Sequence, residues 1–278
     1  GILSFIFRKP NDENCSFAGM DLSNRLGTAA GLDKNGDYID CLGALGFGFL
    51  EVGTVTPLKQ YGNPKPRVFR LVEDEALINR LGFNNLGAQN IAERIKSNKQ
   101  TGLLGVNIGP NKDTENRLRD YVECLKIFHH TADYITINIS SPNTEDLRSF
   151  HEQTKLNELL QTINKEKKNL NSKVPIAVKV SPDINDQEVN KITEVLLSND
   201  IKVVIISNTS DASRDSLSNI QKHQKGGLSG KPIEKKSSTL INKFYKILNG
   251  RIKIIGVGGV DSGKSAYEKF LAGASYVQ

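Results

Sequence analysis

Short apolar runs alternate with longer amphipathic segments along most of the chain. The runs are mostly rich in valine and isoleucine and too short for helices, so they are predicted to be buried parallel strands. They lie at residues 25–31 (the weakest), 47–53, 103–109, 134–140, 175–180, 203–208, 252–258 and 274–278. Segments with apolar residues at helical spacing lie between them, at 37–45, 87–97, 116–128, 156–169, 186–198, 236–248 and 262–272.

This alternation predicts the fold class. Seven or eight strand–helix units favour an α/β protein, a (β/α)8 TIM barrel, over a doubly wound open sheet, which is the alternative. No linker or composition break divides residues 1–278, so a single domain is expected. The last run has no helix after it, so a C-terminal helix is expected to be missing from this sequence.

Composition narrows the class of protein. The 278 residues are 37% hydrophobic, enough for a sizeable core, and no stretch reaches the roughly 18 apolar residues that span a bilayer. The formal charge of +6 lies mostly in Asn/Lys-rich runs typical of solvated helix faces, and no nucleic-acid module accompanies it. The three cysteines form no disulfide framework, which indicates a reducing compartment, and no histidine has metal-site spacing.

The segment Asn138–Thr144, NISSPNT, is the strongest candidate for chemistry. Most such loops are polar turns that cap a strand. Asn138, however, lies inside an apolar run, where a buried amide needs hydrogen-bond partners that a ligand can supply. In a barrel, the ends of the strands face the C-terminal rim, where active sites are built.

Other polar positions follow the strands in the same way. Asn107 and Lys179 lie within apolar strands, and a lysine there is costly unless it is paired. Lys34 follows the small residues Ala29, Ala30 and Gly31, which allow a planar ligand close to the backbone, although most loop lysines are simply solvated. The Asn/Gly-rich segment 79–85 is weak on its own.

Two glycine-rich segments, at 226–230 and 256–260, indicate a phosphate site. The second lies between a predicted strand and helix late in the strand order, where barrels often bind phosphate through backbone N–H groups. No dinucleotide fingerprint opens the chain. Asparagines, two lysines and a phosphate site suit a planar heterocycle with many polar edges.

Together these segments resemble the dihydroorotate dehydrogenase family. The motifs occur in the family's order over nearly all of the chain: AAGLDKNG, GTVTP, NPKPRVFRL, INRLGFNNLG, GVNIG, NISSPNT, AVKVSPD, GGLSGKP and IIGVGGV. The resemblance implies oxidation of dihydroorotate to orotate in pyrimidine (UMP) synthesis, with FMN as the electron acceptor. By analogy Ser141 is the catalytic base, with Thr144 and Phe83 lining its proton relay, because a free serine hydroxyl is a poor base.

The resemblance also assigns binding residues. The residues that it places around the substrate are Lys34, Asn79, Arg80, Leu81, Gly82, Phe83, Asn138, Asn143, Asn208 and Thr209. Those that it places around the flavin and its phosphate are Ala30, Gly31, Lys34, Thr54, Asn107, Asn138, Lys179, Ser207, Gly230 and Gly259. No metal is implied.

A serine at position 141 indicates the class that membrane quinone re-oxidises, since the cytosolic class has cysteine there. Arg70 matches a quinone-side arginine. Residues 1–10 are interpreted as the remnant of an N-terminal membrane-associating extension, otherwise largely absent. Peripheral association with the cytoplasmic side of the cell inner membrane is expected, with the mitochondrial inner membrane as the alternative. Pro110 and Ser207 depart from the residues usual in the family.

Three alternatives remain at this point. One is another flavin barrel acting on a pyrimidine, which Ser141 and the lack of an iron–sulfur cysteine cluster disfavour. Another is a lyase or isomerase acting on a phosphorylated metabolite without redox chemistry. The third is a binding module without activity, for which nothing in the sequence argues.

Overall fold

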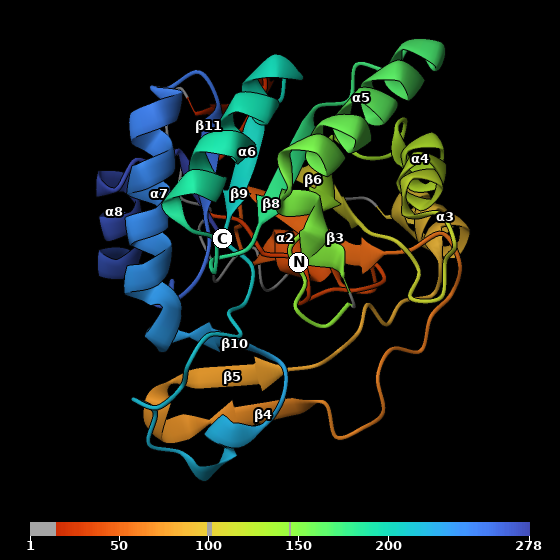
Figure 1. The fold of residues 1–278 in the computed structure, drawn as a ribbon. Coiled ribbons are helices and arrows are strands. Elements are labelled where there is room, and N and C mark those ends of the chain that lie inside the picture. The colour runs from red at the N-terminus through yellow and green to blue at the C-terminus, as the bar shows by residue number, and fades with distance from the viewer. Residues whose placement is uncertain (1–14, 99–101, 145) are drawn as a thin grey trace.

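A curled sheet of seven parallel strands forms the inner wall of the molecule (Figure 1). The computed structural model describes residues 15–98, 102–144 and 146–278, so the expected remnant at residues 1–10 lies outside the described residues. The strands lie in the order β12, β11, β9, β8, β7, β6 and β3. Their bounds are β3 Phe49–Val55, β6 Leu103–Ile108, β7 Tyr134–Asn138, β8 Ile176–Val180, β9 Val203–Ile206, β11 Lys253–Gly256 and β12 Tyr276–Val277.

The segment around Gly27 joins the two edges of this sheet. Leu26 makes a parallel bridge to Val277 of β12, and Gly27 makes one to Phe49 of β3. The backbone hydrogen bond from Gly27 N–H to Val277 O is 2.9 Å long. The predicted strand at 25–31 therefore contributes single bridges, and these close the predicted barrel.

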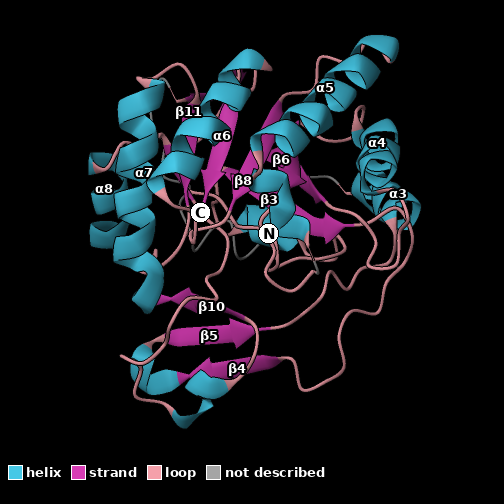
Figure 2. Cartoon of the chain, viewed as in Figure 1, coloured by secondary structure: helices cyan, strands magenta, loops and turns pink. Residues whose placement is uncertain are grey.

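Helices cover the outer face of the sheet (Figure 2). They are α2 Ile39–Ala44, α3 Ala88–Ser97, α4 Arg117–Phe128, α5 Gln153–Asn169, α6 Asp186–Ser198, α7 Glu234–Leu248 and α8 Gly263–Leu271. Asn185 and Ser262 begin α6 and α8 with capping boxes that satisfy free N–H groups. The apolar faces of the helices pack on the strands in the largest hydrophobic cluster, which confirms the alternation predicted from the sequence. No helix among the described residues is long and apolar enough to cross a bilayer.

A second, antiparallel sheet lies beyond one end of the barrel, and the sequence pattern did not predict it (Figure 1). Its strands are β4 Val68–Leu71, β5 Ala76–Asn79 and β10 Gly227–Gly230, with β5 in the middle. The short helices η1 Val72–Asp74, η3 Ile220–His223 and η4 Lys231–Ile233 adjoin them. A separate hydrophobic cluster, which includes Leu71, Ile78 and Leu228, stabilises this small sheet.

A short hairpin plugs the opposite end of the barrel. It consists of β1 Ser16–Phe17 and β2 Met20–Asp21. The Phe17 ring is fully buried and contacts the rings of Phe49, Tyr134 and Tyr276 at centroid distances of 6.0, 4.7 and 5.2 Å. Aromatic side chains therefore fill this end of the barrel core among the described residues.

The predicted strand bounds are wrong in detail. The strand predicted at 47–53 is shifted to Phe49–Val55, so Thr54 belongs to it. The strands predicted at 134–140, 203–208 and 252–258 end two residues earlier, because their last residues turn into the loops at the open end. Those residues include Ser140 and Asn208, and their side chains meet at the candidate site.

Candidate active site

A cavity of about 100 Å³ lies between the open end of the barrel and the small sheet. The residues that line it come from the loops after several strands: Ala30, Gly31, Lys34, Thr54, Asn79, Leu81, Gly82, Phe83, Asn138, Ser141, Pro142, Asn143, Lys179, Asn208 and Thr209. All but Pro142 were predicted as site residues. The structure therefore brings together in one place most of the residues that the sequence motifs singled out.

Buried amides form a hydrogen-bond chain at the base of the cavity. Thr54 Oγ1 donates to Asn107 Oδ1 at 2.6 Å. Asn138 Nδ2 donates to Thr54 Oγ1 at 2.9 Å and to Asn107 Oδ1 at 3.1 Å. Strand register places these side chains together, because Gly53 of β3 pairs with Asn107 of β6, and β6 pairs with β7. Asn107 thus lies beneath the cavity lining and supports it.

The chain continues upward to the loop after β9. Ser140 Oγ donates to Asn138 Oδ1 at 2.8 Å, and Asn208 Nδ2 donates to Ser140 Oγ at 2.9 Å. Thr209 N–H donates to Asn208 Oδ1 at 2.8 Å. Ser207 is buried, and its hydroxyl donates to the Asn208 carbonyl at 3.2 Å. The amide planes of the site are thus tied to one another across three strands.

Ser141 lies on the same loop with its side chain turned to the cavity. The Asn143 N–H donates to Ser141 Oγ at 3.2 Å, and Asn143 Nδ2 donates to the Asn79 carbonyl at 3.0 Å. Ser141 is 5% exposed. Because Oγ accepts a backbone hydrogen bond, its own proton is left to be donated elsewhere.

Two lysines bring positive charge into the cavity. Lys179 of β8 is 4% exposed, and burial lowers the pKa of its ammonium group. Burial, then repulsion from Arg67 and from Lys179, lowers the pKa of Lys34 to about 8. In the described part of the chain neither ammonium has a hydrogen-bond partner, and no carboxylate lines the cavity. The pair therefore fits an anionic ligand.

Asp33 shapes the loop that carries Lys34. Its Oδ1 accepts from Asn35 N at 3.2 Å and from Asp37 N at 3.0 Å, and its Oδ2 accepts from Tyr38 N at 2.8 Å. Gly53 N–H binds the Asp33 carbonyl at 2.9 Å, so the loop is anchored to β3.

Asn85 holds the loop that carries Phe83. Its Nδ2 donates to Thr56 Oγ1 and to the Phe83 carbonyl, both at 2.8 Å. Its Oδ1 accepts from Gly87 N–H at 2.9 Å. Phe83 itself is buried in a left-handed conformation with φ of 51°. Asp33 lies in the motif AAGLDKNG and Asn85 in the motif INRLGFNNLG, but their anchoring roles were not predicted.

Gly230 and Gly259 lie close together, and the chain packs tightly against both. Both have positive φ, of 97° and 69°. A Cβ on Gly230 would lie 2.4 Å from the Glu75 carbonyl oxygen, and one on Gly259 would lie 2.5 Å from Glu234 Cβ. A Cβ at Gly259 would also come within 3.1 Å of the Gly230 carbonyl oxygen. Backbone conformation and close packing therefore both require glycine at these two positions, and each glycine is half-buried.

Besides Asn107, Ser207, Gly230 and Gly259, three predicted residues do not line the cavity. The Arg80 guanidinium donates to Gln224 Oε1 at 2.9 Å and stacks on the Phe69 ring at 4.5 Å, so it faces the loop before β10. Thr144 lies further along the Ser141 loop, and its carbonyl accepts from Leu147 N at 3.3 Å. Arg70 lies on an exposed position of β4.

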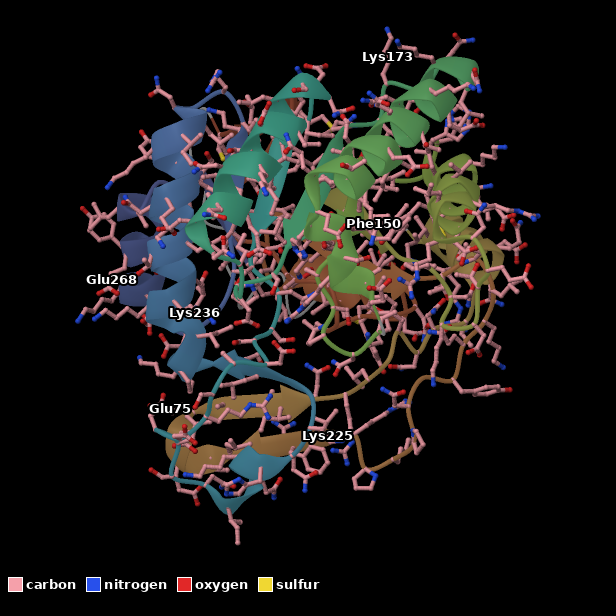
Figure 3. The ribbon with its side chains drawn as sticks, in the orientation of Figure 1. Glu75, Phe150, Lys173, Lys225, Lys236 and Glu268 are labelled. Carbon is pink, nitrogen blue, oxygen red and sulfur yellow. The ribbon has the colours of Figure 1, made fainter. Side chains whose placement is uncertain are left out.

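An ion cluster at the rim was not predicted, and we call it the rim cluster: Arg148, Asp183, Asp211 and Lys236. Arg148, in η2 Leu147–His151, donates to the carbonyls of Ser140 and Thr209 at 3.3 and 3.2 Å. It also pairs with Asp183 at 3.3 Å and with Asp211 at 2.5 Å. Lys236 extends from α7 at the end of the barrel that faces the small sheet, and it binds Asp183 (Figure 3).

The buried His151 secures the same loop from below. Its Nδ1 lies 2.8 Å from the Arg148 carbonyl, and its Nε2 accepts from Ser181 N–H at 3.2 Å. These contacts require the neutral ring with its proton on Nδ1. Burial lowers the pKa of His151, which favours that neutral form.

Comparisons with known proteins agree with this geometry. The family model described as dihydroorotate dehydrogenase matches residues 14–278. The chain is 46% identical over 285 residues to a protein of Buchnera aphidicola subsp. Schizaphis graminum named dihydroorotate dehydrogenase (quinone), covering all of this chain and 84% of that one. A protein of Hamiltonella defensa with the same name is 50% identical over 268 residues, covering 94% and 79%.

Solved structures of DHODH from Eimeria tenella share the fold. The ligand-free structure superimposes with a TM-score of 0.91 at 36% identity, covering 100% of this chain and 86% of that one. The complex with ferulenol gives a TM-score of 0.90 at 36% identity, covering 97% and 80%. Together with the closed barrel and its cavity, these matches establish that the chain is an oxidoreductase that belongs to the dihydroorotate dehydrogenase family.

Proposed function

We propose that the protein oxidises dihydroorotate to orotate in pyrimidine biosynthesis, with FMN as the bound electron acceptor and a membrane quinone as the final oxidant. One observation carries the proposal. A single cavity joins several amides and a serine to two ammonium groups, and no carboxylate lines it. This set suits a planar anion whose ring edges carry carbonyl and N–H groups, which describes both orotate and an isoalloxazine ring.

The residues fit FMN at two places. Gly230 and Gly259 are half-buried and carry no side chain, so their backbone is proposed to bind the phosphate. Lys179 provides a buried positive charge, and the amides of Asn107 and Asn138 provide polar contacts for a ring. Ala30, Gly31, Thr54 and Ser207 complete the proposed flavin contacts. When bound, FMN supplies the acceptor for the hydride removed from C6 of the substrate.

Ser141 is proposed to remove the proton from C5 of dihydroorotate. The Asn143 N–H that binds its Oγ orients the lone pairs, and the hydroxyl proton must leave as the new one arrives. Thr144 is proposed to receive that proton through a relay, and Phe83 to screen the relay from solvent.

The substrate ring is proposed to bind between the two amide-bearing loops. Asn79, Asn143, Asn208 and Thr209 offer donors and acceptors to the ring edges, together with Asn138 below and Arg80 beside them. The backbone of Leu81, Gly82 and Phe83 covers the ring. Lys34 is proposed to pair with the carboxylate, and its pKa of about 8 leaves most of it charged at neutral pH.

The quinone and membrane parts of the proposal rest on the names of the relatives and on Arg70. Relatives from Buchnera aphidicola, Acinetobacter baylyi and Hamiltonella defensa carry the name dihydroorotate dehydrogenase (quinone). Arg70 lies on the exposed side of β4, at the same end of the barrel as the cavity. Peripheral attachment to the cytoplasmic side of an inner membrane is proposed, where quinone is available.

Anaerobic mixing of purified Ser141→Ala with dihydroorotate tests the proposal. The wild-type flavin absorbance is expected to bleach. The variant is expected to keep its flavin but to bleach at least about 100-fold more slowly, because the base is gone. Ser149→Ala, on the same loop with its hydroxyl on the Asp146 carbonyl, is the control and should react normally. A Ser141→Ala rate equal to that of wild type would refute the assignment of the base, and a colourless wild-type protein would refute the flavin.

A further inference from the structure

Glu51 is a buried carboxylate inside the barrel, below the cavity. It lies on β3 and is 1% exposed. Three groups contact it, and all three are donors. Asn107 Nδ2 donates to Oε1 at 2.8 Å, while Tyr134 OH and Gln278 Nε2 donate to Oε2 at 2.9 and 3.2 Å. Burial, and then the charge of Glu51, raise the pKa of Tyr134 well above its usual range, so this hydroxyl keeps its proton.

The direction of the hydrogen bonds above Glu51 follows from this contact. A carboxylate only accepts, so it binds the NH2 end of the Asn107 amide and turns Oδ1 toward the cavity. Asn107 Oδ1 then accepts from Thr54 and from Asn138 Nδ2. With its Nδ2 engaged in this way, Asn138 presents Oδ1 to the Ser140 hydroxyl.

The same direction reaches the loop after β9. The Ser140 hydroxyl donates to Asn138, so its oxygen accepts from Asn208 Nδ2 at 2.9 Å. Asn208 Oδ1 is thereby turned to the Thr209 N–H. Reversing any one amide would place two donors or two acceptors against each other in a buried site, which costs about 1–3 kcal/mol per unsatisfied group. We call these groups the interior chain: Glu51, Asn107, Thr54, Asn138, Ser140 and Asn208.

We propose that Glu51 is a positioning residue that sets the donor and acceptor pattern of the site for its ring ligands. It touches neither ligand and acts through Asn107. The inference rests on the proposed function, since it concerns how the same cavity recognises orotate and FMN. Glu51 also places a negative charge in the barrel near Lys179, where it partly opposes the effect of burial on that ammonium.

Two substitutions at this position distinguish positioning from packing. Glu51→Gln keeps the size of the side chain but can present either a donor or an acceptor to Asn107, so both directions of the chain become accessible. Glu51→Asp keeps an acceptor-only group and removes one methylene. If Glu51 positions the amides, the glutamine variant is the more impaired. If Glu51 only fills space, the aspartate variant is the more impaired.

The measurement is the dissociation constant of orotate, taken from the change in flavin absorbance on titration, alongside the melting temperature. We expect Glu51→Gln to bind orotate about 10-fold more weakly, and Glu51→Asp less than about 3-fold more weakly. Glu166→Gln on α5, whose carboxylate pairs with Lys126 at 3.3 Å, is the matched control and should bind normally. The reverse order of the two Glu51 variants, or wild-type affinity in Glu51→Gln, would overturn the proposal.

Two further readouts keep the test decisive. If Glu51→Gln purifies without flavin, FMN is titrated into the apoproteins of both variants by fluorescence quenching, and the same order is expected. If instead the wild-type protein neither bleaches with dihydroorotate nor binds orotate, the proposed function fails, whereas the order of FMN affinities still tests the role of Glu51.

Discussion

The interior chain and the rim cluster hold the same loops by different forces. The interior chain consists of short hydrogen bonds between buried groups, most of them neutral, on neighbouring strands. The rim cluster consists of ion pairs between side chains that are partly exposed, such as Arg148 and Asp183. Salt screens exposed charges over roughly 10 Å at 0.1 M and roughly 3 Å at 1 M, but it hardly affects buried dipoles. The base of the site is therefore fixed by strand register, whereas the loops at its rim are held by ion pairs whose strength depends on salt.

Asn138→Leu breaks the interior chain and should have the largest effect. The leucine fills a similar volume but removes one hydrogen-bond partner from each of Thr54, Asn107 and Ser140. We expect the free energy of unfolding to fall by about 3 kcal/mol in urea denaturation, equally at low and high salt. Asn190→Leu, on the exposed face of α6, serves as the control. A loss that shrinks in high salt would show that the interior chain is not insulated from solvent.

Arg148→Met breaks the rim cluster and should have an intermediate effect that depends on salt. Losing the guanidinium frees the carbonyls of Ser140 and Thr209, so the loop with Ser141 is less well placed. We expect flavin reduction by dihydroorotate to slow about 10-fold at roughly 0.05 M salt, and the difference from wild type to narrow near 1 M.

Arg119→Met is the matched control, because Arg119 pairs with Glu123 on the surface of α4. It should react like wild type at both salt concentrations. An Arg148→Met defect of equal size at both concentrations would mean that the rim cluster acts through packing rather than charge.

Lowering the pH should weaken the contacts of His151 and of the rim cluster before it affects the interior chain. This is the smallest of the three expected effects. The pKa of His151 is lowered on folding, so its contribution to stability is lost as pH falls below about 6.5, where the unfolded state takes up the proton first. Burial raises the pKa of Asp183, but hydrogen bonds from Lys236, Ser210 and Asp211 outweigh it and lower the pKa to about 2. The contribution of Asp183 is therefore lost between pH 3.8 and about 2.

Urea denaturation at a series of pH values checks this prediction. His151→Gln should reduce the loss of stability just below pH 6.5, to which His129 also contributes, and leave the loss below pH 3.8 unchanged. His223→Gln, at an exposed position in η3, is the control. An unchanged pH profile in His151→Gln would assign the first loss to another group.

The sequence predicts the parts of the site that depend on single strands. Asn107, Asn138 and Lys179 are polar residues inside apolar runs, and each is buried as expected. Glu51 lies in the same kind of run, yet it was not singled out. Its three partners lie on β6, on β7 and directly after β12, so only strand register shows that they meet.

The small sheet could not be predicted from local pattern for a similar reason. Its strands are each four residues long, and half of β10 is glycine. Such a segment has little intrinsic preference for a strand, and it becomes one only by pairing with β5. The rim cluster likewise joins η2, the loops after β8 and β9, and α7, so its members are far apart in the sequence.

The pairing of β5 with β10 also governs when the site can come into existence. Ser229 Oγ reaches the Leu77 carbonyl across 152 residues of sequence. Contacts of such high sequence separation form late in folding, because a long loop must close before they stabilise anything. On the ribosome, the loop that carries Asn79 and Phe83 must therefore wait for its strand partner until β10 has been synthesised. A newly made chain is expected to become able to bind a ligand only after that point.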